Sequence, residues 1–192
     1  TMNSLLETIT PERKTHYINR EGNLIHKTKK RQECEKTYLE LLRNGLSPKW
    51  FMSFHWIGRK TRSREEVQKH TKHLKNVLLT FLLNLDSPRK IPSPPERPRC
   101  VFFHEKNLTT SGSTFRYIFG GHLHLEGHKN IKTFYDLWEL WDSVHPHVKE
   151  LSSDFHITEY SVERHWDYNF KDAGNTSIPD GDLCLDLFNS DL

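Results

Sequence analysis

The chain has 192 residues, 28% of them charged and 34% hydrophobic, and this length suits one domain with a sizeable core. The net charge of +3 permits a nucleic-acid partner without requiring one. Three widely spaced cysteines argue against a disulfide framework or a cysteine-based zinc site, and no apolar run approaches the roughly 18 residues of a membrane span. We therefore expect an intracellular protein without a membrane segment. The threonine before Met2 is typical of a residue left by cloning, so we expect the chain to be part of a longer protein.

The first part of the chain is predicted to contain two helices and one strand. Residues 1–47 are polar and basic, with a short helix over 35–45, and we assign them to an N-terminal extension outside the core. The aromatic run WFMSFHWIG at 50–58 has the length of a strand. Apolar residues then recur at helical spacing over 63–85, and Ser63 opens this helix with a capping box.

The second part of the chain alternates strands and helices. The predicted elements are an extended proline-rich connector (87–99), a hairpin of two strands (100–106 and 115–126), a helix (131–145), a strand (154–163), a short helix (165–174) and an acidic tail (175–192). From residue 48 to 174 the order is therefore β-α-β-β-α-β-α. Two right-handed β-α-β halves of this kind interleave into one antiparallel sheet. We predict an α+β domain over 48–174, of split β-α-β (ferredoxin/RRM-like) type, with helices on one face and the other face open to a ligand.

The segment GGHLHLEGH at 120–128 carries two histidines separated by one leucine. Successive side chains of a strand alternate between faces, so His122 and His124 would lie side by side on the open face. Glu105 on the preceding strand could reach the same end of the sheet, whereas His104 would point to the opposite face. Two imidazoles and one carboxylate suit Mn²⁺ or Mg²⁺ and leave coordination positions for substrate oxygens.

Aromatic and basic side chains are interleaved along the first predicted strand and just after it. Such a set can stack on bases and contact the phosphates of a single strand. The residues predicted to bind DNA are Phe51, Ser53, Phe54, Trp56, Arg59 and Lys60.

Three short motifs follow one another along the chain. They are FMSF at 51–54, HLH at 122–124 and YNFK at 168–171, the last followed by Asp172. In this order they resemble the FLTY-type strand, the histidine–hydrophobic–histidine motif and the YxxK motif of the HUH endonucleases, and among them of the rolling-circle replication initiators. The resemblance covers residues 48–174, and its specificity comes from the combination, since either short motif alone occurs by chance.

The resemblance implies sequence-specific nicking and joining of single-stranded DNA. Tyr168 would attack the phosphodiester, and Lys171, three residues later on the same helix face, would position the phosphate or stabilise charge. Glu105, His122 and His124 would hold the divalent ion, Mn²⁺ or Mg²⁺. The products would be a 5′-phosphotyrosine and a free 3′ hydroxyl.

The same resemblance implies the protein's partners and location. The DNA would be a replication origin or hairpin of a plasmid or virus, and a helicase domain or a host helicase would act with the endonuclease. The protein would lie in the cytoplasm of a prokaryotic host, or in the host nucleus if it comes from a eukaryotic virus.

Other functions remain open. A non-catalytic RRM-like module would share the fold but would not need both motifs, and a transposase or relaxase of the same superfamily would share both. A metal-free phosphoesterase of the 2H type needs two paired HxT or HxS motifs; HIT at 156–158 fits, whereas HLH at 122–124 has no hydroxyl. Tyr160 is a rival nucleophile, but it lies in a strand pattern and lacks the lysine three residues later.

Overall fold

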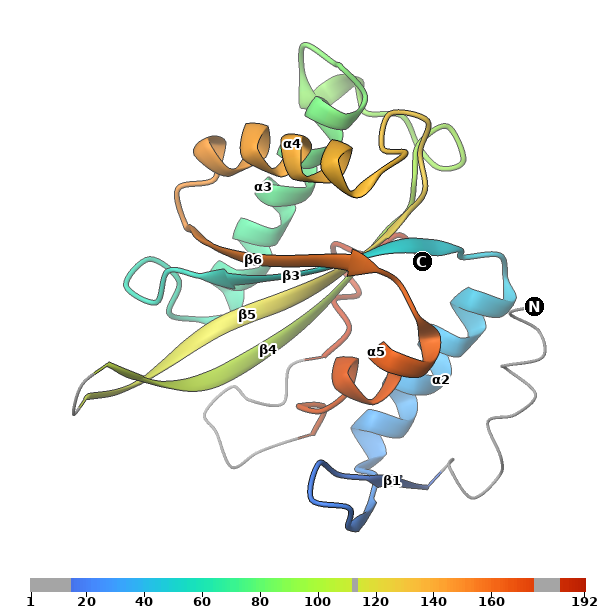
Figure 1. Cartoon of the computed structure of the whole chain (residues 1–192), viewed down its shortest axis with the longest axis vertical. Coiled ribbons are helices and arrows are strands. Elements are labelled where there is room, and N and C mark those ends of the chain that lie inside the picture. Colours follow the sequence, from blue (N-terminus) through green and yellow to red (C-terminus); the bar gives the residue numbers. More distant parts are fainter. Residues whose placement is uncertain (1–14, 112–113, 175–183) are drawn as a thin grey trace.

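The computed structural model describes residues 15–111, 114–174 and 184–192 (Figure 1). The strands are β1 (His16–Ile18), β2 (Leu24–His26), β3 (Pro48–Trp56), β4 (Cys100–Ser111), β5 (Thr114–Glu126) and β6 (Leu151–Glu159). The helices are α2 (Lys29–Arg43), α3 (Arg64–Leu82), α4 (Phe134–Val144) and α5 (Val162–Asn169), with short 3₁₀ turns at Pro88–Lys90 and His145–His147. No helix in these described ranges is both long and apolar enough to cross a membrane.

The main sheet has the strand order β4-β5-β3-β6, and each neighbouring pair is antiparallel. The chain passes from β3 through α3 to β4, and from β5 through α4 to β6. Each of these connections joins two parallel strands that have one antiparallel strand between them. The predicted element order from β3 onward and the predicted α+β class with an antiparallel sheet are therefore confirmed. β1 and β2 form a separate two-stranded hairpin.

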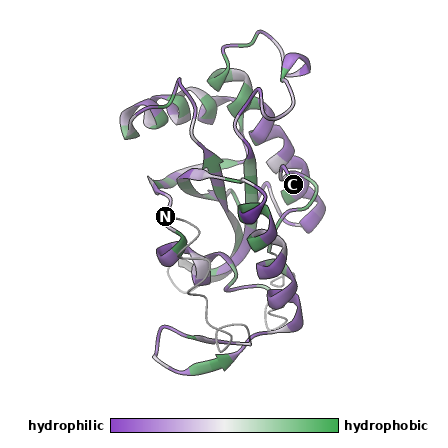
Figure 2. Cartoon of the chain, turned by 90° about the vertical axis from the view of Figure 1, so that its right-hand side faces the viewer, coloured by the Kyte–Doolittle hydropathy of each residue, from purple (hydrophilic) through white to green (hydrophobic). Residues whose placement is uncertain are grey.

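Helices lie against both faces of the main sheet, so the prediction of helices on one face only is wrong (Figure 1). α3 and α4 cover one face, and α2 and α5 lie on the other. The core under α3 and α4 includes Trp50, Met52, Phe54, Trp56, Leu74, Leu123 and Trp141. The core under α2 and α5 includes Tyr38, Leu41, Leu42, Val101, Phe103 and Phe170. Figure 2 shows hydrophobic segments, in green, along the strands of the sheet between the helical layers.

The helix α2 belongs to this second core and not to an extension. It begins at Lys29, earlier than predicted, because the side chain of Thr28 accepts a hydrogen bond from the backbone nitrogen of Arg31. It ends just before Gly45, whose φ of +96° suits glycine. Its apolar residues recur three and four positions apart, which creates one face that must be buried. The predicted extension outside the core is therefore corrected for this helix, while residues 1–14 lie outside the described ranges.

The β4–β5 hairpin is longer than predicted. Its register is continuous from Cys100 opposite Leu125 to Ser111 opposite Thr114. The turn-rich segment expected between two shorter strands is thus mostly paired strand, and residues 112–113 at its tip are outside the described ranges. β3 pairs with β5 only from residue 120 to 126, so the rest of the hairpin extends past the sheet as a ribbon (Figure 1).

Residues 184–192, the described part of the predicted acidic tail, run along the outer edge of β4. The backbone nitrogen of Asp186 donates to the carbonyl of Phe102 over 2.8 Å, and that of Asp191 donates to the carbonyl of Cys100 over 2.8 Å. The segment therefore covers an edge strand whose backbone groups would otherwise be unpaired.

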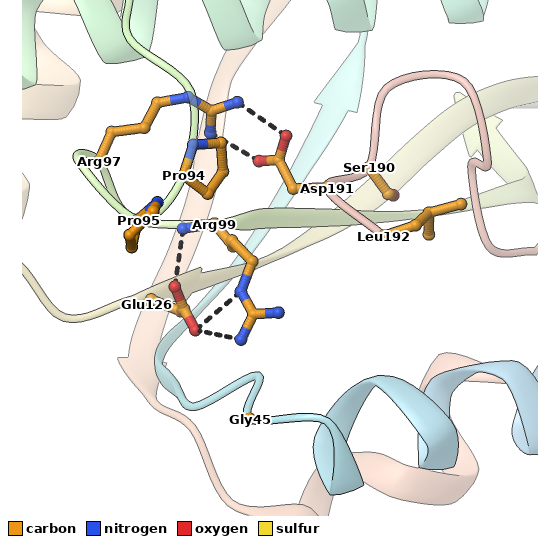
Figure 3. Close-up of a pocket in the computed structure, with 9 residues that line it drawn as sticks. All are labelled: Gly45, Pro94, Pro95, Arg97, Arg99, Glu126, Ser190, Asp191 and Leu192. Atoms are coloured by element: carbon orange, nitrogen blue, oxygen red, sulfur yellow. Dashed lines mark hydrogen bonds and ion pairs between the residues drawn. The ribbon is translucent and has the colours of Figure 1, made fainter.

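Asp191 anchors this segment to the proline-rich connector, beside the pocket drawn in Figure 3. Its carboxylate accepts two hydrogen bonds of 2.7 Å from Arg97, one of 2.8 Å from Lys75 and one of 2.8 Å from the backbone of Cys100. Burial opposes the charge, but these donors outweigh it and hold the pKa of Asp191 below its usual range.

We expect Asp191→Asn to lower the free energy of unfolding by about 2–4 kcal/mol at pH 7, because it leaves two partly buried cations without their carboxylate. A lowered folded-state pKa contributes stability above the unfolded value of about 3.9, and this contribution is lost as the pH falls through the folded value. The difference in the free energy of unfolding between the wild type and Asp191→Asn should therefore become smaller below about pH 4. Urea denaturation at pH 7 and pH 3 measures both effects. Asp86→Asn is the matched control, because its pair with Lys90 is exposed and should contribute under about 1 kcal/mol.

Candidate catalytic site

His122 and His124 lie on the face of β5 that α2 and α5 cover. In the register with β3, Phe51 is opposite His124 and Ser53 is opposite His122. The ring of Phe51 contacts both imidazoles, with centroids 5.2 Å from His122 and 5.5 Å from His124. The two histidines therefore share a face, as the alternation of a strand predicts, but this face is buried and not open.

Glu105 reaches His122 across the hairpin although 17 residues separate them in the chain. Phe103 is opposite His122 in the register, so Glu105 lies two positions further along β4 on the same face. Nε2 of His122 donates to Oε2 of Glu105 over 3.2 Å. Gly120, opposite Glu105, makes room for the carboxylate, since a Cβ there would lie 3.1 Å from Oε1 and 3.1 Å from the carbonyl oxygen of Phe54.

His104 points to the other face of the sheet. Its Nε2 lies 2.7 Å from Oδ2 of Asp186 in the segment that covers the edge of β4. Of the two neighbouring candidates for a third ligand, the structure therefore brings Glu105, and not His104, to His122.

Tyr168 on α5 and Lys171 in the turn after α5 lie next to His122 and Glu105. The ring centroids of Tyr168 and His122 are 4.8 Å apart. Nζ of Lys171 lies 2.6 Å from Oε2 of Glu105 and 4.2 Å from the ring centroid of Tyr168. The predicted helix over 165–174 is corrected, because α5 spans Val162–Asn169 and Lys171 lies beyond its end. The turn after α5, and not a shared helix face, brings the lysine to the tyrosine.

Among the charged side chains of this site, Glu105 is buried, and Lys171 and Asp172 are half-buried. Burial opposes the charge of Glu105, but the hydrogen bond from His122 and the ammonium of Lys171 outweigh it and hold the pKa of Glu105 below its usual range. Burial lowers the pKa of Lys171, and the adjacent Glu105 more than compensates, so its net shift is upward. Burial raises the pKa of Asp172 to about 6. At neutral pH the site therefore combines an ionised carboxylate and a cationic lysine beside the Tyr168 phenol.

His124 is surrounded by partners that sequence analysis did not identify. Its Nδ1 forms a hydrogen bond with the hydroxyl of Tyr38, and its Nε2 lies 3.1 Å from Oδ1 of Asn169. The Tyr38 hydroxyl donates in turn to that of Tyr160 over 3.0 Å. Burial is the main reason that the pKa of His124 lies well below its ordinary value, so the imidazole is neutral. No local signal identifies Tyr38, because it lies 86 residues from His124.

His165 is a second residue of the site that sequence analysis missed. Its ring stacks on that of Phe51, with the ring centroids 3.9 Å apart and an angle of 4° between the ring planes. It precedes Tyr168 by three residues, so the helical spacing could have indicated that both face the sheet.

The donor set at Glu105 and His122 fits a divalent cation. Two ligands that bind one ion at about 2.1 Å lie about 3.0–3.4 Å apart in octahedral or tetrahedral geometry, and the observed separation is 3.2 Å. His124 is held on Tyr38 and Asn169, and no group of three His, Cys, Asp or Glu side chains within the described ranges is arranged as a metal site. Glu105 and His122 would therefore hold the ion, and His124 would join them by leaving Asn169.

The predicted DNA-binding residues do not form one surface. Phe54 and Trp56 are each only 1% exposed and belong to the core under α3 and α4, so their prediction as stacking residues is wrong. Phe51 is buried on the opposite face, beneath the site. Side chains alternate between the two faces of a strand, so Phe51 and Phe54, three positions apart, point to opposite faces of the sheet. The remaining residues are Ser53, which is half-buried beside His122 in the register, and Arg59 and Lys60, which are exposed just after β3.

Comparisons of the chain with protein-family models, with curated proteins and with solved structures find no match.

Proposed function

We propose that the chain is a metal-dependent endonuclease and ligase of the HUH type, which nicks and rejoins single-stranded DNA through Tyr168. The observation that carries this proposal is the convergence of four side chains from three separate segments. Glu105 contacts both His122 and Lys171, and the ring of Tyr168 lies against His122 and Lys171. A nucleophile, a cation and a group of possible metal ligands are thus adjacent, as phosphodiester displacement requires.

The strand order supports the finer fold assignment that we propose. The order β4-β5-β3-β6, with α3 and α4 as the two connections, is the order expected of a split β-α-β sheet. In the proposed HUH domain, the HLH strand is central and the helix with the tyrosine follows the last strand. α5 is this tyrosine helix, and α2 is an addition; together they enclose the site on the second face of the sheet.

In the proposed reaction, the hydroxyl oxygen of Tyr168 attacks phosphorus. The bond from phosphorus to the tyrosine oxygen forms, the bond to the 3′ oxygen breaks, and the phenol proton is balanced by the proton gained by the 3′ hydroxyl. Lys171 would contact a non-bridging phosphate oxygen or stabilise the phenolate. A divalent ion, Mn²⁺ or Mg²⁺, would neutralise charge on the phosphate when bound by Glu105 and His122. The DNA would be an origin or hairpin, and a helicase would supply further single strand.

The structure weighs against the alternative of a non-catalytic RRM-like module. Such a module presents aromatic side chains on an exposed sheet face for base stacking. Here the corresponding face lies under α2 and α5, and Phe51 is 3% exposed. A transposase or relaxase of the same superfamily would use the same four side chains and differ in its DNA target.

Formation of a covalent protein–DNA adduct tests the proposal. The protein is incubated with Mn²⁺ and a pool of single-stranded oligonucleotides that have a randomised centre and a 3′ label, because the downstream fragment would stay on the tyrosine. We expect a labelled band that resists denaturation, disappears with EDTA and gives a nucleotide-modified peptide containing Tyr168. A nucleotide on another residue would contradict the assignment, and salt-sensitive binding without any adduct would favour the binding module.

Removal of the lysine should slow the reaction without stopping it. We expect Lys171→Ala to reduce the rate of adduct formation about 10²-fold, because the ammonium stabilises charge but forms no bond. Lys72→Ala is the matched control, since this exposed lysine lies on α3 beyond the opposite face of the sheet. If Lys171→Ala formed the adduct at the wild-type rate, Lys171 would have no role in the proposed reaction.

A further inference from the structure

The buried imidazole of His124 has a hydrogen-bonding partner at each ring nitrogen. Nδ1 meets the hydroxyl of Tyr38 on α2, and Nε2 meets the amide of Asn169 on α5. Tyr38 is itself fully buried, and its hydroxyl donates to that of Tyr160 after β6. Residues of α2, of α5 and just after β6 thus hold one imidazole of β5.

The number of protons in this chain of hydrogen bonds decides the tautomer of His124. A hydroxyl has one proton, so Tyr38, which donates to Tyr160, can only accept from His124. Nδ1 must then carry the proton. A neutral imidazole has one N–H, and burial of this ring among aromatic residues favours the neutral form. Nε2 is therefore left with its lone pair.

The amide of Asn169 supports the same tautomer. Its Nδ2 is buried without a hydrogen-bonding partner, while Oδ1 faces Nε2 of His124 over 3.1 Å. Two acceptors in contact would repel each other. A half-turn of the amide places the unpaired Nδ2 donor against the Nε2 lone pair and satisfies both atoms. The lone pair is then held by a neutral donor that a stronger partner can displace.

We propose that Tyr38 is a positioning residue that, together with Tyr160, holds His124 as its Nδ1–H tautomer and keeps the Nε2 lone pair available to a divalent cation. The inference rests on the proposed function, to which it adds two residues outside its motifs. Histidine ligands generally donate their second N–H to a fixed acceptor, which sets the tautomer and raises the basicity of the ligating nitrogen. Here the acceptor is a tyrosine hydroxyl, and α2 thereby becomes part of the site.

The opposite arrangement would exclude His124 from metal binding. If Tyr160 donated to Tyr38 and Tyr38 donated to Nδ1, the proton would lie on Nε2 and would be donated to Oδ1 of Asn169. His124 would then have no lone pair directed toward the site. The two arrangements differ in which ring nitrogen carries the proton, and this is measurable without any metal.

Long-range proton–nitrogen correlation spectra of the metal-free protein, labelled with ¹⁵N-histidine, test the tautomer directly. His124→Gln identifies the signals. We expect the wild type to show a protonated Nδ1 at His124, and Tyr38→Phe, which removes the acceptor, to move the proton to Nε2. Tyr160→Phe should do the same, because the Tyr38 hydroxyl is then free to donate to Nδ1. A protonated Nε2 in the wild type, or a tautomer unchanged in both variants, would overturn the inference.

Calorimetric titration with Mn²⁺ then tests the consequence for binding. We expect Tyr38→Phe to bind Mn²⁺ about 10–100-fold more weakly than the wild type. Tyr135→Phe, a substitution of a 78% exposed tyrosine on α4, should bind it equally well. Equal affinity in Tyr38→Phe and the wild type would overturn the positioning role. A wild type that binds no Mn²⁺ would instead refute the cation of the proposed function and, with it, the ligand role of His124, whatever the tautomer.

Discussion

Tyr168→Phe is expected to abolish both the nick and the covalent adduct, with a loss of at least about 10⁴-fold in rate, because it removes the oxygen that we propose as the attacking atom. The substitution removes one atom from a half-buried ring whose described contacts are with other rings and with the cationic groups of Arg20 and Lys171. The fold and the binding of single-stranded DNA should therefore remain. An oligonucleotide selected in the adduct assay is labelled at its 5′ end to follow the nick and, separately, at its 3′ end to follow the adduct, and a denaturing gel measures both products.

Two further variants distinguish Tyr168, the proposed nucleophile, from other tyrosines of the chain. Tyr135→Phe alters a distant exposed ring and should leave the rate unchanged. Tyr160→Phe should still form the adduct on Tyr168 at saturating Mn²⁺, because the Tyr160 hydroxyl is engaged with Tyr38 and burial raises its pKa to about 12. An adduct that persists in Tyr168→Phe and disappears in Tyr160→Phe would reverse the assignment.

Glu105→Gln should reduce cleavage at least about 10³-fold and weaken Mn²⁺ binding, because a neutral amide cannot balance the charge of the divalent ion that we propose to bind here. The amide has nearly the shape of the carboxylate, so the hairpin should keep its register. His122→Ala should have the same effect, since the two side chains are 3.2 Å apart and would share one ion.

The measurements are the nicking rate and the Mn²⁺ affinity of each variant, with circular dichroism to confirm the fold. Glu163→Gln is the matched control, because this glutamate is exposed in the first turn of α5. Full cleavage by either Glu105→Gln or His122→Ala would rule out the proposed metal site. A variant that lost Mn²⁺ binding but kept its cleavage rate would show that the ion is not required for cleavage.

Periodicity in the sequence was sufficient to predict the order of strands and helices from β3 to α5. Alternation along a strand depends only on the backbone, so the common face of His122 and His124 and the opposite orientation of His104 followed from spacing alone. Helical spacing and the cap at Ser63 likewise placed α3 within a few residues of its observed bounds.

The tertiary structure alone decided what covers each face and which distant residues meet. The amphipathic pattern of α2 shows that one side must be buried, but not that the sheet face carrying His124 is what buries it. The period of two separates Phe51 from Phe54 without saying which of them enters the core. Tyr38 reaches His124 only because α2 packs on that sheet, and such a contact between residues far apart in the chain leaves no local signal in the sequence.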